Sequence, residues 1–366
     1  MNNKIIIEDY REFKDFKGCT FNNIKNTEVK KELIKCLTEN NYDKSLYWMS
    51  EIMCSCNYIL LWEIFFYIMT NIVNISNLKL IIFLNKKYDI FKDIINNCKN
   101  ENEVINLRNN NNIRFLFCDI VILICNSDKN YMLDYKKINV KDFSFEKMNN
   151  FLKAPNVNYV NSFFKDNDPK ELYIILNEFI YNLEEKNNIE CYKWIYIYIN
   201  YYLLCKKNNN ILLCELREEL DLDSYSKNLK HHPIWIIWSI LMNKSKKYNL
   251  VNNYVKLLLN FFKVQLTYGK IKSRLNILFF CITIYIQKDS REIFDKPIVK
   301  NKERFMELDN IARNSINNIL KKIIQNYKKN PENIKQTKNK NSKVLMSFEK
   351  LKLLDNFMLN KNNDNN

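Results

Sequence analysis

The sequence predicts an all-α protein, a multi-helix array or bundle around one continuous core, with two abutting helical subdomains as the alternative. Apolar residues make up 47% of the chain, which is ample for a buried core. They recur at spacings of three and four, the period of an α-helix. The chain has only two glycines, and neither follows Asn or Asp, so the common hairpin turns are missing. Helices are therefore favoured over strands.

Residues 1–26 are expected to form an N-terminal arm, and residues 27–223 a helical domain. Thr27 is a candidate N-cap for the first helix. The segment Asp168-Pro169-Lys170-Glu171 predicts another helix start, because it combines a capping carboxylate, a proline at the first helical position and a capping-box glutamate. The helices expected here cover residues 27–39, 44–73 (two helices broken near Cys56), 78–97, 113–125, 168–183 and 190–205.

Residues 224–328 are expected to form a basic helical subdomain with helices over 233–243, 250–264, 273–287 and 303–327. Residues 329–342 are lysine-rich and lack apolar periodicity, which predicts a flexible basic linker. An amphipathic helix follows over residues 343–360, which either docks back on the core or binds a partner protein. The last six residues, 361–366, predict a disordered tail.

The charge of the chain is concentrated in one segment. No Asp or Glu occurs from Ser224 to Lys288, where eleven cations supply +11 of the formal net charge of +16. An acidic cluster, Glu215 to Asp223, directly precedes it, which is compatible with two subdomains or with one segment folding back on the other. A third explanation stays open: AT-rich codon usage enriches Lys and Asn without any partner selecting them.

If the positive charge is functional, phosphate is the expected ligand. Lysines attract a nucleic-acid backbone without reading bases, so binding would be non-specific and salt-sensitive. Nearby Trp235 and Trp238 lie at helical spacing among Ile and Leu, which favours a place in the core. The candidate nucleic-acid-binding residues are Lys244, Lys246, Lys247, Lys256, Lys263, Lys270, Lys272, Arg274, Lys321, Lys322, Lys328 and Lys329.

The sequence lacks the motifs of the common nucleotide-binding and metal-binding sites. Two isolated glycines exclude a dinucleotide fingerprint and a Walker A loop. His231 and His232 are adjacent, so they point about 100° apart and cannot form a zinc-protease pair, although one could cap the helix after Pro233. Cys54 and Cys56 have no second matching pair, so no metal site is expected. We therefore expect no cofactor and no enzymatic activity.

Eleven cysteines without regular spacing, in a chain with no secretory signal, predict free and mostly buried thiols in a reducing compartment, the cytoplasm. The most membrane-like stretch is Asn57 to Leu84. Its longest uncharged part, Ile64 to Leu78, has 15 residues, fewer than the roughly 18 to 20 that cross a bilayer. We expect buried helices there and no transmembrane segment.

Several aromatic helix segments resemble an uncharacterised protein family of nucleocytoplasmic large DNA viruses, the giant viruses of the mimivirus kind. They cover most of residues 44–245 and are KSLYWMSEIMCSCNYILLWEIFF, LKLIIFLNKKYDIFKDIINN, LRNNNNIRFLFCDIVILICNSDK, DPKELYIILNEFIYNL and HPIWIIWSIL. The resemblance implies a setting in the host cytoplasm, a virus factory or a virion. It carries over no catalytic residue.

Together these observations lead us to expect a non-enzymatic viral interaction protein that acts in genome replication, transcription or packaging, with weak non-specific binding to phosphate backbones. The alternative is a structural or virion-scaffold protein whose basic face meets acidic protein or membrane surfaces.

Overall fold

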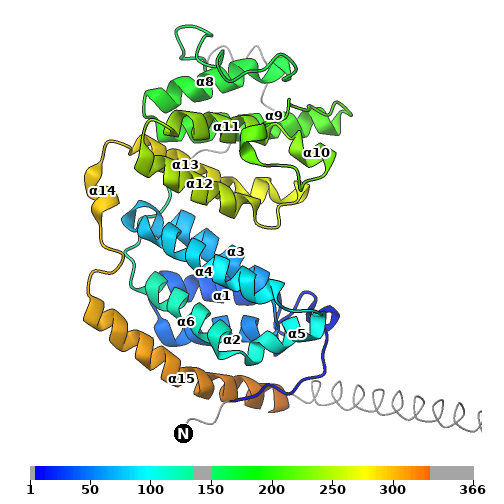
Figure 1. Ribbon diagram of the computed structural model, residues 1–366, viewed down its shortest axis with the longest axis vertical. Coiled ribbons are helices and arrows are strands. Elements are labelled where there is room, and N and C mark those ends of the chain that lie inside the picture. The colour runs from blue at the N-terminus through cyan, green and yellow to red at the C-terminus, as the bar shows by residue number, and fades with distance from the viewer. Residues whose placement is uncertain (1–4, 135–150, 330–366) are drawn as a thin grey trace, which may run out of the picture. The chain divides into compact units, whose positions relative to one another are not determined.

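The computed structural model in Figure 1 describes residues 5–134 and 151–329. Fourteen α-helices form within these residues, and no strand does; Cys19 and Lys25 make an isolated β-bridge. The all-α prediction is thus confirmed. The described chain divides into two compact units. Unit 1 comprises residues 5–64, 89–126 and 301–329, and unit 2 comprises residues 65–88, 127–134 and 151–300.

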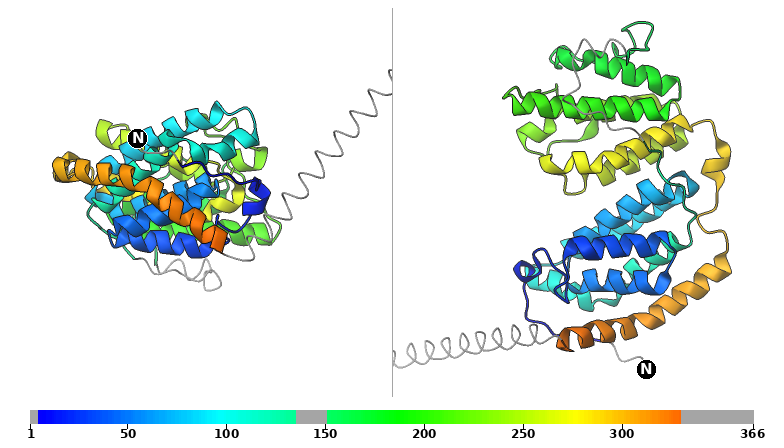
Figure 2. Two further views of the ribbon diagram at one scale, coloured as in Figure 1. Left: turned by 90° about the horizontal axis from the view of Figure 1, so that it is seen from below. Right: turned by 180° about the vertical axis from the view of Figure 1, so that it is seen from behind.

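Unit 1 is built around α6, whose side chains are buried almost all the way round. Helix α2 packs on α6 and on α1, and the long α15 runs across α2 and α6 (Figures 1 and 2). The bounds of the helices are α1 Asn26–Thr38, α2 Tyr42–Cys54, α3 Tyr58–Ile68, α4 Lys79–Asn96, α5 Glu101–Asn106, α6 Asn111–Cys125 and α15 Lys302–Lys329; the division between the units falls within α3 and α4.

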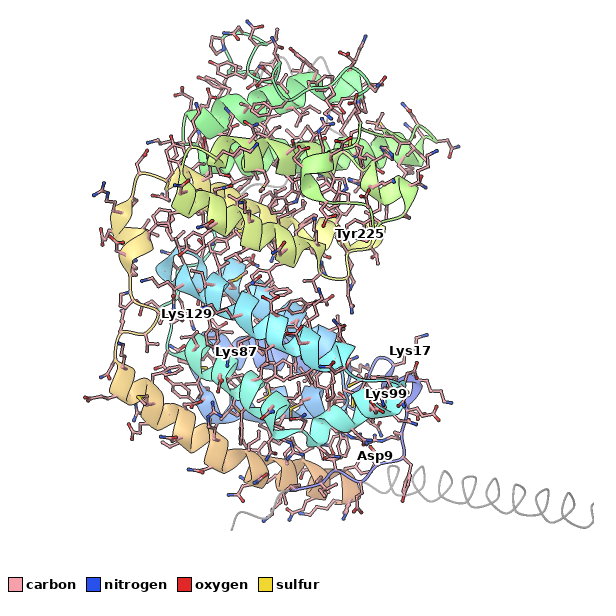
Figure 3. All side chains as sticks on the ribbon, viewed as in Figure 1. Asp9, Lys17, Lys87, Lys99, Lys129 and Tyr225 are labelled. Carbon is pink, nitrogen blue, oxygen red and sulfur yellow. The ribbon has the colours of Figure 1, made fainter. Side chains whose placement is uncertain are left out.

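The first described residues are pinned to unit 1 by buried polar contacts. Arg108 donates to the carbonyl of Asp9 at 2.9 Å, and the Asp9 carboxylate forms a buried ion pair with Arg11 at 2.7 Å, at the place labelled in Figure 3. The Arg11 guanidinium lies 4.2 Å from the ring centroid of Tyr327 on α15. The Glu51 carboxylate of α2 accepts hydrogen bonds from Thr20 and Asn22. Residues 5–26 of the predicted arm are therefore part of the fold of unit 1.

Unit 2 is built around α13, whose side chains are buried almost all the way round, Asn276 being the exception. Helices α9, α11 and α12 pack on it, and α8 packs on α9. A short π-helix, η2 (Met69–Val73), also contacts α13. The bounds of the helices are α8 Tyr173–Glu184, α9 Asn188–Lys207, α10 Lys227–Lys230, α11 Ile234–Ser245, α12 Asn249–Lys263, α13 Leu275–Ile286 and α14 Arg291–Asp295.

The two units interleave along the chain, in a way the sequence did not indicate. The boundary placed between residues 223 and 224 lies inside unit 2, and α15 belongs to unit 1 although it follows the basic segment. Charge composition marked that boundary, but packing of apolar faces decides which helices join one core. The linker after Lys329, the helix expected over 343–360 and the tail lie outside the described residues.

Asparagine replaces glycine at several chain reversals. Asn40 lies within the α1–α2 connection with φ at 56°, and Asn209 follows α9 with φ at 60°. Left-handed backbone is cheapest for Gly and next for Asn, so a glycine-poor chain uses Asn at helix ends. Lys186 and Gln265 also take positive φ, at 57° and 44°. These two positions carry backbone strain.

Two predicted helix caps are wrong. The helix near Thr27 begins one residue earlier, at Asn26, with no side-chain cap. Before α8, a 3-10 turn over Lys170–Leu172 follows Pro169, also without a side-chain cap. The Asp168 carboxylate instead forms a buried ion pair with Arg217. It also accepts the backbone N–H groups of residues 165 and 215, at 2.9 Å each. Pairing with a buried guanidinium outweighs capping here.

Candidate nucleic-acid interface

Helix α9, from its middle to its C-terminal end, and the turns before α13 form a strip of lysines and tyrosines within unit 2. The turns are the 3-10 segments η9 (Tyr268–Lys270) and η10 (Lys272–Arg274). We call Lys206, Tyr268, Tyr196 and Lys272 the lysine–tyrosine strip.

At one end of the strip, the Lys206 ammonium lies 3.8 Å from the ring centroid of Tyr268, a cation–π contact. Tyr268 in turn packs on His232, with ring centroids 5.2 Å apart. Burial, assisted by the charge of Lys206, lowers the pKa of His232 to about 3. This histidine is therefore neutral, and its Nδ1 accepts the Ile234 N–H at 3.0 Å at the start of α11. His232 thus accepts the first N–H of α11 from the position before Pro233, one of the roles that the sequence allowed for a histidine there.

At the other end of the strip, Lys272 extends from η10 to α9. Its ammonium donates to the Asn200 side-chain oxygen at 3.3 Å and lies 5.8 Å from the ring centroid of Tyr196. Both Lys206 and Lys272 are exposed, and within residues 5–134 and 151–329 neither forms an ion pair with a carboxylate. Two cations held on neutral partners keep their charge available to an anion.

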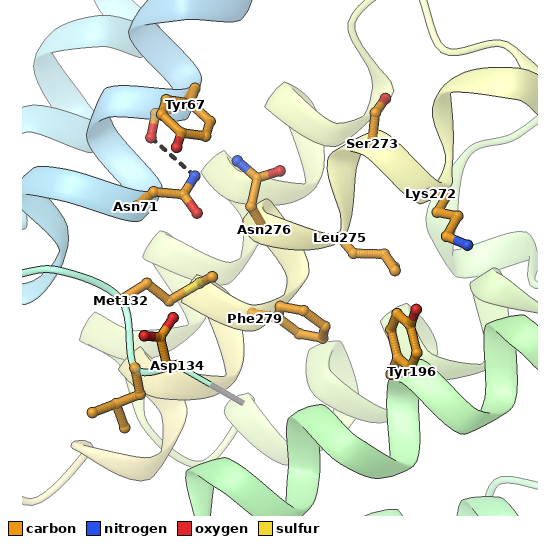
Figure 4. A pocket seen from close by; sticks show the side chains of 11 residues that line it. Tyr67, Asn71, Met132, Asp134, Tyr196, Lys272, Ser273, Leu275, Asn276 and Phe279 are labelled. Atoms are coloured by element: carbon orange, nitrogen blue, oxygen red, sulfur yellow. Dashed lines mark hydrogen bonds between the residues drawn. The ribbon is translucent and has the colours of Figure 1, made fainter. Parts of the chain in front are cut away.

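Beside Lys272 lies a pocket of about 370 Å³. Figure 4 shows Tyr67 and Tyr196 on opposite sides of it, with Leu275 and Phe279 between them. The side chains that line the pocket are Tyr67, Asn71, Met132, Leu133, Asp134, Tyr196, Lys272, Ser273, Leu275, Asn276 and Phe279.

One wall of the pocket, formed by residues 132–134, is fixed to η2 by the backbone. The Met132 N–H donates to the Asn71 carbonyl at 2.9 Å. Two residues earlier, the Asn130 N–H donates to the Ile72 carbonyl at 2.7 Å. These two bonds hold the extended segment before residue 134 against η2, although the two are about 60 residues apart in the chain.

Three of the cations predicted to bind nucleic acid have internal partners. Arg274 is buried and donates to the Phe262 carbonyl at 2.7 Å, so it caps the C-terminal end of α12. Lys263 is half-buried and donates to the carbonyls of residues 220 and 221, and burial lowers its pKa. Lys244 forms an ion pair with Glu184. Lys244 is therefore removed from the contact predicted at residues 244–247, and Arg274 from the one predicted at residues 270–274.

The other predicted cations divide between the two units. Lys246, Lys247 and Lys256 are exposed in unit 2, and Lys270 is partly exposed in η9. The remaining four lie in unit 1, exposed at the C-terminal end of α15: Lys321, Lys322, Lys328 and Lys329.

The acidic cluster folds back on the basic segment within unit 2. Its Glu218–Leu220 part is a 3-10 turn that contacts α11, where the Ser239 hydroxyl donates to Glu219. Tyr225, labelled in Figure 3, donates to the Lys263 carbonyl at 3.0 Å, at the end of α12. Of the two arrangements that the charge pattern allowed, folding back is the one observed. The cluster meets α11 and α12, and the lysine–tyrosine strip lies on α9 and the turns before α13.

Sequence reasoning missed Lys206, Tyr196 and Tyr268 as members of one surface. Lys206 lies at the end of α9, outside the acid-free segment from Ser224 to Lys288 that contains most of the predicted cations. The available signal was the run of tyrosines in α9, which is too dense for one buried stripe and so leaves some rings at the surface.

No group of His, Cys, Asp and Glu suited to a metal ion occurs in the part of the chain that the structure describes. All eleven cysteines are free thiols, and nine of them are buried. Burial raises the pKa of the Cys56 thiol to about 11 and that of Cys214 to about 12, so neither is a reactive thiolate at neutral pH.

One described segment, Tyr58–Ser76, is long and apolar enough to cross a membrane by length and composition. Of its most apolar window, 61% is buried inside the protein, as in a core helix. In comparisons with protein-family models, with curated proteins and with solved structures, nothing matched this chain.

Proposed function

We propose that the protein is a non-enzymatic interaction protein that binds nucleic acid weakly through its phosphate backbone. The observation that carries the proposal is the pair Lys206 and Lys272, two exposed cations supported by tyrosine rings and without a carboxylate partner among the described residues. A phosphate that approaches either ammonium displaces only water and counterions, which is the source of salt-dependent affinity.

The chemistry of the strip favours attraction without sequence reading. Lysine is a flexible point charge, unlike the planar fork with which arginine recognises guanine. The one arginine in the candidate set of unit 2, Arg274, is occupied by backbone carbonyls. Contacts to phosphate therefore position a strand on the surface and contribute no sequence preference.

The resemblance to giant-virus proteins favours a role in genome replication, transcription or packaging, in the cytoplasm or a virion. The free, buried thiols agree with a reducing compartment. A second candidate function is a structural or scaffold protein with a basic face for acidic protein or membrane surfaces. The exposed lysines at the end of α15 favour it, since they lie in unit 1, apart in sequence from the strip.

An electrophoretic mobility shift at about 50 mM salt tests the proposal, since several phosphate contacts hold a strand at that salt concentration. The wild type should shift single-stranded and double-stranded DNA and RNA. Lys206→Gln/Lys272→Gln should bind about tenfold more weakly, because each exposed ion pair contributes up to about 1 kcal/mol.

The matched control is Lys31→Gln/Lys35→Gln, which removes two exposed lysines from α1 and leaves the same net charge. It should bind as the wild type does. Absence of any shift by the wild type, or an equal loss in both double variants, contradicts the proposed role of the strip.

A further inference from the structure

The two asparagine side chains in the pocket are held in one orientation by Thr70. The Thr70 hydroxyl is buried and donates its hydrogen to the Phe66 carbonyl at 2.9 Å. It therefore acts as an acceptor toward the amide nitrogens of Asn71 at 2.9 Å and Asn276 at 2.6 Å. Asn71 also donates to the Tyr67 carbonyl at 3.1 Å, a group that can only accept. The nitrogen and oxygen of each amide are thus assigned by chemistry.

Because both nitrogens face Thr70, both side-chain oxygens are turned away from it. Neither oxygen accepts a hydrogen bond from another of the described residues. Both asparagines line the pocket, so each side-chain oxygen is an acceptor at its wall, and Figure 4 shows the Asn276 oxygen turned away from Asn71. The exposed Asp134 carboxylate adds a third acceptor to the lining. The pocket therefore offers acceptors to a ligand that carries hydrogen-bond donors.

The remaining lining suits a flat ring. Leu275 and Phe279 lie between the tyrosines and are apolar, and Tyr67 is 39% exposed. Aromatic rings stack on bases of any sequence in proteins that bind single strands. The pocket volume of about 370 Å³ lies at the lower end of the roughly 300–1,000 Å³ typical of small-ligand sites. It suits one small ring system.

We propose that this pocket takes an unpaired nucleobase that bears an exocyclic amino group, while the phosphates of the same strand lie along Lys272 and Lys206. An amino group presents two hydrogen-bond donors, and the side-chain oxygens of Asn71 and Asn276 are acceptors in the lining. In a duplex that group is paired and stacked, so single strands are favoured. The inference rests on the proposed nucleic-acid binding and adds a base class and a strand preference to it.

Fluorescence anisotropy with the full chain at about 50 mM salt tests the inference, with labelled oligodeoxycytidine, oligodeoxyuridine of equal length and a duplex as probes. Cytosine and uracil have the same size, and cytosine alone has the amino group. Oligodeoxycytidine should bind at least about fivefold tighter than oligodeoxyuridine, the lower limit for a good two-bond contact to a base. It should also bind tighter than the duplex.

Two variants test whether the pocket makes the distinction. Asn276→Leu and Asn71→Leu should each abolish the preference for cytosine and leave the binding of the duplex unchanged. The control is Asn260→Leu, an exposed position on α12, which should keep the preference.

The inference is overturned if the wild type binds the three probes with equal affinity. If Lys206→Gln/Lys272→Gln then weakens the binding of all three, the proposed function still stands. A cytosine preference that persists in both pocket variants also overturns it. If no probe binds the wild type, both the inference and the proposed function fail. The comparison of probes on the wild type needs no variant to fold.

Discussion

Thr70 and Asn276 are 206 residues apart in the chain and meet in a hydrogen bond of 2.6 Å from the Asn276 amide to the Thr70 hydroxyl. The bond joins η2 to α13 within unit 2. The same hydroxyl receives the amide of Asn71, so one buried oxygen orients both asparagines of the pocket. The polarity of the pocket wall thus depends on a residue that does not line it.

Thr70→Val should lower the free energy of unfolding by about 1–3 kcal/mol, because the buried Phe66 carbonyl loses the hydroxyl hydrogen and two amides lose their acceptor. Urea denaturation monitored by circular dichroism measures the change. Thr267→Val, at an exposed position before η9, is the control and should be neutral. An unchanged midpoint for Thr70→Val would show that the hydroxyl does not support this wall.

Arg217→Met should destabilise the protein by about 3–5 kcal/mol, because it leaves the Asp168 carboxylate buried without its cation. The double variant Asp168→Leu/Arg217→Met should recover a large part of the loss, since no uncompensated charge remains. Both are compared with the wild type by urea denaturation. A double variant no more stable than Arg217→Met would refute this account of the pair.

Stability should depend on pH through Glu51. Burial raises the pKa of this carboxyl above its ordinary value of 4.5. Between pH 4.5 and the raised pKa, the folded protein binds more protons than the unfolded chain. The stability that the protonated carboxyl provides is therefore fully present below pH 4.5 and is lost as pH rises through the raised pKa.

Glu51→Gln removes this titration. The stability of the wild type relative to Glu51→Gln should therefore fall as pH rises from 4.5. Urea denaturation midpoints of the wild type and Glu51→Gln, measured over a series of pH values, give the difference. Glu28→Gln, at an exposed position on α1, is the control. A relative stability that rises with pH would mean that the folded state favours the charged form of Glu51.

Gln265→Gly should stabilise the protein by about 1 kcal/mol, because Gln265 holds φ at 44° in the left-handed region, which costs an L-residue roughly that amount. Gln265→Ala should bring no such gain, since alanine keeps the steric penalty. Thermal denaturation of the two variants decides between them: equal midpoints would show that this backbone is not strained.

The positions of the helices could be predicted from periodicity. The expected helices over 250–264 and 303–327 correspond to α12 and α15 within a few residues. Their grouping could not be predicted, because contact between distant segments decides it. Helix α15 follows the basic segment in sequence, yet its buried residues Ala312 and Ile316 face the core of unit 1.

The candidate site was only partly accessible from sequence for a similar reason. Arg274 and Lys272 are two residues apart and carry the same charge, yet Arg274 is buried against the carbonyls of α12 and Lys272 is exposed beside a pocket. Charge alone does not distinguish them. The orientation of Asn276 depends on Thr70, a partner that no local pattern indicates.

The salt dependence of binding tests the central claim most directly. Anisotropy with a labelled single strand, measured over a range of salt concentrations, gives the slope of log K against log salt. Each phosphate contact contributes about 0.7 to that slope. Lys206→Gln/Lys272→Gln should therefore reduce its magnitude by about 1.4, and Lys31→Gln/Lys35→Gln should leave it unchanged. A slope that is the same in the wild type and in Lys206→Gln/Lys272→Gln would contradict the claim that these two lysines contact phosphate.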